Sequence, residues 1–150
     1  MPKNILESVS RDLAERVEKA TDEEKRAICV PVCKLAVTRT GLDEPPVTKA
    51  LRLLENGIFK DQQVTTALKR LFGDLDNSYF AAEELYKEGK GTEDAYIALA
   101  RKARAADAVL ASFNDDAFVA ATHSLYEACA ALGSADEIQA IVMDVLARNQ

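Results

Sequence analysis

The chain has 150 residues, of which 48% are apolar and 29% are charged, and its formal net charge is −6 at pH 7. This length favours one domain, over 1–150, and this composition is typical of a globular protein rather than a disordered one. The acidic balance argues against nucleic acid as a partner, because contacts with phosphates need a surface rich in lysine and arginine.

The first forty residues predict two helices. In the stretch of about 4–19, apolar residues recur at spacings of three and four, which is the pattern of a helix with one buried face. Thr21 and Glu24 form a capping box, so we expect the next helix to begin there and to end near Gly41. Pro31 lies inside that helix and predicts a kink or a break just before it, since proline lacks the N–H of the helical ladder.

Three further helices are expected before residue 92. One follows the turn at Pro45 and runs from Pro46 to about 56. Another begins near Asp61 and stops at Gly73, because glycine commonly follows the last residue of a helix. The third runs from about 75 or 77 to 88.

The stretch of about 92–132 predicts the organising feature of the fold, a hairpin of two long helices. Thr92 caps the first helix, and Asn114 caps the second after a short turn. The buried face of the first helix follows a spacing of three and four, at Tyr96, Leu99, Ala103, Ala106, Leu110 and Phe113. With a last helix after Gly133, the sequence predicts an all-α fold: a compact bundle of seven or eight mainly antiparallel helices centred on this hairpin.

Three cysteines and one histidine are the candidate zinc ligands. Cys29 and Cys33 lie one turn apart on a helix, and Cys129 and His123 would complete a set of four. The cysteine pairs of structural zinc sites usually lie in turns and are closer in sequence than Cys29 and Cys33. A free cysteine is commonly a small buried apolar residue. We therefore predict no metal and no cofactor, and the sequence leaves open whether these four residues converge.

His123 is the only histidine, and Glu127 follows it by one helical turn. The two could form a histidine–carboxylate couple in a cleft, as acid–base catalysis requires. A structural ion pair is the favoured interpretation. No serine or cysteine is placed as a nucleophile beside this histidine, so we predict no catalytic residue.

Two groups of residues are candidates for binding a partner. Arg101, Lys102 and Arg104 are the densest basic group of the predicted hairpin, although such a group is usually a solvated helix face. Tyr79 and Phe80 are adjacent, and adjacent residues on a helix cannot both face one core. One of the two aromatic rings is therefore expected at the surface, where aromatic residues often contact other proteins.

An odd number of cysteines without the density of a disulfide framework indicates a reducing compartment. The N-terminal residues show no apolar signal segment, and no apolar run reaches the ~18 residues that a membrane span needs. We therefore expect a cytoplasmic protein without a membrane partner.

These observations favour a non-enzymatic protein-interaction module, such as an adaptor, a regulator or a toxin-neutralising protein. Its partner would be another protein, and the acidic charge favours a basic one. Two alternatives stay open. One is an enzyme or ligand-binding protein with a pocket between helices near His123 and Glu127, and the other is a homodimeric structural protein.

Overall fold

The computed structural model describes residues 4–148, and over this range the chain forms helices and no strand. This confirms the predicted all-α fold. None of the helices in this range is long and apolar enough to cross a membrane. The elements are one short 3-10 helix, η1 (Ile5–Ser8), and seven α-helices: α1 (Arg11–Lys19), α2 (Asp22–Thr40), α3 (Pro45–Glu55), α4 (Gln62–Lys87), α5 (Glu93–Ala111), α6 (Ala117–Leu132) and α7 (Asp136–Arg148).

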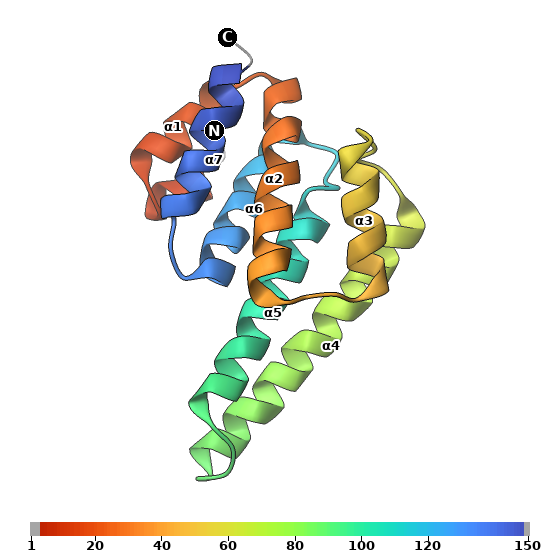
Figure 1. Ribbon diagram of the computed structural model, residues 1–150, viewed down its shortest axis with the longest axis vertical. Helices are drawn as coiled ribbons and strands as arrows, with labels where there is room; N and C mark the ends of the chain where they lie inside the picture. The colour runs from red at the N-terminus through yellow and green to blue at the C-terminus, as the bar shows by residue number, and fades with distance from the viewer. Residues whose placement is uncertain (1–3, 149–150) are drawn as a thin grey trace.

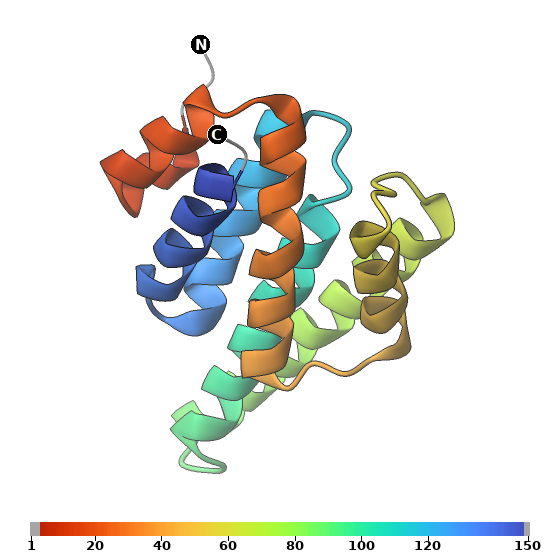
Figure 2. The ribbon, with the colours of Figure 1, turned by 45° about the horizontal axis from the view of Figure 1, so that its top comes forward.

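The helices form a body from which one pair of helix ends projects (Figure 1). In the body, α2 packs against α5 and α6, with α1 and α7 on one side of it and α3 on the other (Figure 2). The second half of α4 and the first half of α5 extend beyond the body as an antiparallel pair. We call residues 69–102 the arm. None of these residues is buried, whereas Leu68 and Ala103 on either side of the arm are fully buried.

The centre of the body is narrow because small side chains line it. The buried residues of α5 and α6 include nine alanines, at Ala103, Ala105, Ala106, Ala108, Ala111, Ala120, Ala121, Ala128 and Ala131. Alanine lets helix axes approach closely, so backbone groups come within reach of side chains on neighbouring helices. The Ala108 carbonyl accepts hydrogen bonds from Ser124 Oγ of α6 at 2.7 Å and from Cys33 Sγ of α2 at 3.5 Å. Three helices therefore meet at one carbonyl.

The predicted hairpin of about 92–132 is present as α5 and α6, which pack side by side. Only part of it is central, because the first half of α5 leaves the body and pairs with α4 in the arm. The expected cap at Asn114 is wrong by two residues. Asp116 accepts the backbone N–H of Val119 and caps α6, while Asn114 accepts the N–H of Asp116 and shapes the turn before it.

The predicted stop at Gly73 is wrong. A single helix, α4, runs through this glycine from Gln62 to Lys87. Glycine inside a helix costs about 1 kcal/mol relative to alanine, so it weakens a helix without ending it. Leu71, Phe72 and Leu75, on both sides of Gly73, pack against the core and keep the helix continuous.

Two further sequence expectations differ from the structure. The helix expected over 4–19 is divided, because Ser10 caps a new helix by accepting the N–H of Leu13. Pro31 does not break α2, which is continuous from Asp22 to Thr40. Ile28, Val32 and their neighbours are buried on the faces of this helix, and we attribute its continuity past the missing hydrogen bond to that packing.

Candidate functional site

A cluster of charged side chains joins α4, α5 and α6 at the base of the arm. Arg104 of α5 lies at its centre. Its guanidinium nitrogens are 3.0 Å from Glu127 Oε2 of α6, 3.3 Å from Asp76 Oδ1 of α4 and 4.0 Å from Asp107 Oδ2 on its own helix. The guanidinium also stacks over the ring of Phe72, 5.0 Å from its centroid. Arg104 therefore ties together the three helices from which the arm leaves the body.

His123 contacts two of the same carboxylates. Its Nε2 is 3.5 Å from Asp107 Oδ2 and 3.8 Å from Glu127 Oε1. The pair that the sequence suggested, His123 and Glu127, is therefore together in space. Sequence reasoning missed Asp107, although its spacing of three residues from Arg104 was a usable signal. It also missed Asp76, whose position depends on how α4 packs against α5.

The cluster carries more negative than positive charge in a place with little solvent. The side chain of Glu127 is only 8% exposed, that of Asp107 is 15% exposed, and that of His123 is 44% exposed. Burial raises the pKa of Glu127, and the nearby Arg104 offsets part of this effect. The carboxylates of Asp76, Asp107 and Glu127 thus lie around the single guanidinium of Arg104.

The cluster opens into a groove on the body. The groove has a volume of about 410 Å³. It reaches Asp107 and His123, so both side chains are accessible to a small ligand. The lining residues are Thr65, Lys69, Asp107, Leu110, Ala111, Phe113, Asn114, Asp115 and His123.

The cysteines do not contribute to this cluster. Within residues 4–148, the one group of three or more possible metal ligands is Asp107, His123 and Glu127, so the four residues considered for zinc do not converge. All three thiols are buried, and burial raises the pKa of Cys29 and of Cys129 to about 11. The pKa of Cys33 is raised further. These thiols are protonated at neutral pH and act as small apolar residues.

The three basic residues predicted as a partner surface lie in three different environments. Arg101 is exposed and lines a second groove, together with Arg39 and the end of α6. Lys102 is half-buried. Arg104 is engaged with the carboxylates of the cluster. A role in partner binding for Arg101 and Lys102 stays a prediction.

The arm carries an aromatic cluster on its surface. The ring centroids are 5.1 Å apart for Tyr79 and Phe80, 6.1 Å for Tyr79 and Tyr96, and 5.2 Å for Tyr86 and Tyr96. Phe80 is 55% exposed and Tyr79 is half-buried, as expected for adjacent residues on one helix. Leu85 and Tyr86 are exposed as well.

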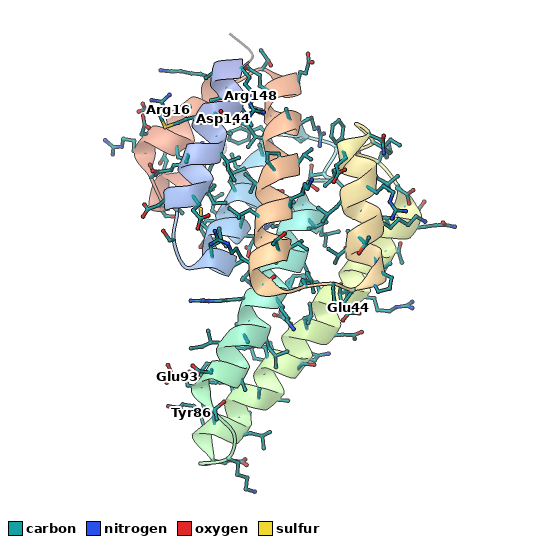
Figure 3. The ribbon with its side chains drawn as sticks, viewed as in Figure 1. Arg16, Glu44, Tyr86, Glu93, Asp144 and Arg148 are labelled. Carbon is teal, nitrogen blue, oxygen red and sulfur yellow. The ribbon has the colours of Figure 1, made fainter. Side chains whose placement is uncertain are left out.

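Hydrogen bonds hold the tyrosines of this cluster in place. The Tyr79 hydroxyl donates to Glu83 at 2.8 Å on α4, and the Tyr86 hydroxyl donates to Glu93 of α5 at 3.2 Å. Tyr86 and Glu93 lie toward the far end of the arm (Figure 3). The exposed ring of Phe80 has no polar group, so it makes no hydrogen bond of this kind.

Comparisons with models of protein families, with curated proteins and with solved structures find no match to this chain. Its function is therefore inferred from its own residues.

Proposed function

We propose that the protein is a non-enzymatic interaction module, of the kind used by adaptors, regulators and toxin-neutralising proteins, and that it binds a basic protein through the arm. One observation carries this proposal: no residue of 69–102 is buried, yet this stretch exposes Phe80, Leu85 and Tyr86. Exposed aromatic residues grouped on a projecting element are typical of a binding surface.

The arm has little core of its own. Two helices cannot enclose the apolar side chains between them, so part of this surface stays in contact with water. A partner that covers Phe80 would remove that ring from water and stabilise the complex by about 25 cal/mol per Å² before the costs of association. Phe80 is the expected anchor, because large aromatic residues dominate interface energies.

The charges around Phe80 support a basic partner. Residues three and four positions away on a helix are neighbours of a side chain, and around Phe80 these are Asp76, Asn77, Glu83 and Glu84. Three of the four are acidic. Asp76 contacts Arg104 at 3.3 Å and Glu83 contacts Lys87 at 3.4 Å, whereas Glu84 makes no ion pair within residues 4–148. The matching surface has an apolar pocket for Phe80 surrounded by lysine and arginine side chains.

The same charges argue against a second copy of the chain as the occupant. Two copies that met at Phe80 would bring acidic residues against acidic residues, which opposes association. Light scattering after gel filtration tests this point. We expect a monomer, and a stable dimer that Phe80→Ala dissociates would replace the proposal with the homodimer alternative.

Affinity capture from the native host tests the partner itself. The bait is the full chain, with Phe80→Ala as the test variant and Met143→Ala as the matched control, since Met143 is an exposed apolar residue on α7. We expect a basic protein to be captured by the unchanged chain and the control and to be lost with Phe80→Ala. Equal capture by all three baits, or capture of acidic proteins only, would refute the proposal.

A further inference from the structure

The cluster at the base of the arm has a donor set that suits a metal ion. Asp107 and Glu127 offer carboxylate oxygens and His123 offers a ring nitrogen, and these three atoms all lie within 4.8 Å of one another. Zinc binds such ligands at about 2.0–2.2 Å, which places tetrahedral ligand atoms about 3.4 Å apart. The distances from His123 Nε2 to the two carboxylates, 3.5 and 3.8 Å, are close to this spacing.

The number of carboxylates supports this geometry. Three of them, from Asp76, Asp107 and Glu127, surround the single guanidinium of Arg104. A divalent cation would offset this excess of carboxylates. Within residues 4–148, the basic side chains that reach Asp107 or Glu127 are Arg104 and His123.

Arg104 and the groove complete the arrangement. Arg104 donates a hydrogen bond to Oε2 of Glu127, while Oε1 is the oxygen that His123 approaches, at 3.8 Å. Groups of this kind, which hold a metal ligand without touching the metal, raise metal affinity. Asp107 and His123 line the groove, so an ion could enter and keep open positions for water or a small ligand.

We infer that Asp107, His123 and Glu127 form a binding site for one divalent ion of the zinc type, with Arg104 as the residue that positions Glu127. The imidazole selects zinc and neighbouring transition metals over magnesium and calcium, which prefer oxygen ligands. Three protein ligands and an open groove match the composition of zinc sites that bind a further ligand. The three ligands are not among the residues of the proposed binding surface around Phe80, so either proposal can fail without the other.

Calorimetric titration of the full chain with Zn²⁺, after treatment with a chelator, tests the inference. We expect one Zn²⁺ per chain and no binding of Mg²⁺. Asp107→Asn and His123→Ala should each weaken Zn²⁺ binding by at least about tenfold, because each removes a ligand. Glu93→Gln, which removes an exposed carboxylate of the arm, and Cys129→Ala should leave binding unchanged.

A spectroscopic measurement distinguishes the loss of the metal site from the loss of the fold. Co²⁺ bound in place of Zn²⁺ should give a visible absorption band for the unchanged chain that is lost with His123→Ala, while circular dichroism shows that the variant keeps its helices. The inference is overturned if the chain binds no Zn²⁺, or if Asp107→Asn and His123→Ala bind it as tightly as the unchanged chain.

Discussion

Arg104 of α5 donates a hydrogen bond to Glu127 of α6 at 3.0 Å, and Glu127 is buried. Because a buried carboxylate needs a partner, replacing Arg104 by alanine leaves an uncompensated charge inside the protein. We expect Arg104→Ala to lower the free energy of unfolding by about 2 kcal/mol, less than for a fully buried pair, because Arg104 itself is partly exposed. Chemical denaturation monitored by circular dichroism measures the loss.

A matched control distinguishes this effect on stability from the effect of removing an arginine at the surface. Arg16 pairs with Asp12 at 2.9 Å on the surface of α1, where Figure 3 labels it. Arg16→Ala should cost less than about 0.5 kcal/mol, since exposed pairs contribute little. If the two variants were equally stable, the Arg104 cluster would not hold the helices together.

Gly73 offers a prediction of the opposite sign. It lies inside α4 with ordinary helical backbone, and a Cβ atom added there would meet nothing within 4 Å. Gly73→Ala should therefore stabilise the protein by about 0.5–1 kcal/mol. Thermal unfolding gives the measurement.

Gly133 is the contrasting site for the same substitution. Its φ is +75°, and an added Cβ would lie 3.0 Å from Arg101 Nη2. Gly133→Ala should destabilise the protein by about 1–2 kcal/mol, because a side chain is strained in the left-handed region.

The prediction for Gly73 has its own contradicting outcome. A Gly73→Ala variant that is less stable than the unchanged chain would mean that α4 needs its glycine.

The contrast between these glycines shows how far the sequence predicts this fold. The helical periodicity and the capping residues Thr21 and Thr92 predict the helices and most of their ends. Gly73 and Gly133 are the same residue type, yet α4 continues through Gly73, where Leu71, Phe72 and Leu75 pack against the core. A local sequence pattern does not contain the packing between helices that accompanies this continuity.

The candidate sites also combine local features, which the sequence predicts, with contacts that depend on the fold. The spacing of His123 and Glu127 on one helix is local, and the sequence identified this pair. Asp76 is 28 residues from Arg104 in the chain, so its contact depends on the fold. The exposure of one of the two rings of Tyr79 and Phe80 was expected from their adjacency, but the choice of Phe80 and the projecting arm that presents it depend on the fold.

The buried thiols predict a loss of stability at alkaline pH. The pKa of Cys29 is raised from 9.0 to about 11 in the folded protein. The protonated thiol therefore stabilises the fold fully below pH 9, and this contribution is lost as the pH rises through 11. Over this interval the free energy of unfolding should fall by about 1.4 kcal/mol per pH unit for this one group.

Paired denaturation curves between pH 8 and 11 test that slope. Cys29→Ala should show a shallower fall by this amount, whatever its stability at pH 8. Thr66→Ala, an exposed site without a titrating group, should keep the slope of the unchanged chain. Parallel slopes in all three proteins would show that folding does not raise the pKa of Cys29.

The arm should open more readily than the body. It has no buried residue between 69 and 102, so its backbone hydrogen bonds are protected by few apolar contacts. In hydrogen exchange, we expect amides of residues 77–100 to exchange by local opening, and amides of α2 and α6 to exchange only by global unfolding. Equal protection of the arm and of α2 would contradict this.

The most direct test of the proposed function is the affinity of Phe80→Ala for the captured basic partner. Removing a central aromatic anchor should weaken binding by about 30-fold, whereas Met143→Ala should change it by less than about twofold. Rising salt should slow association for the unchanged chain, since acidic side chains surround Phe80. An unchanged dissociation constant for Phe80→Ala, with Met143→Ala as the reference, would show that the arm is not the binding surface.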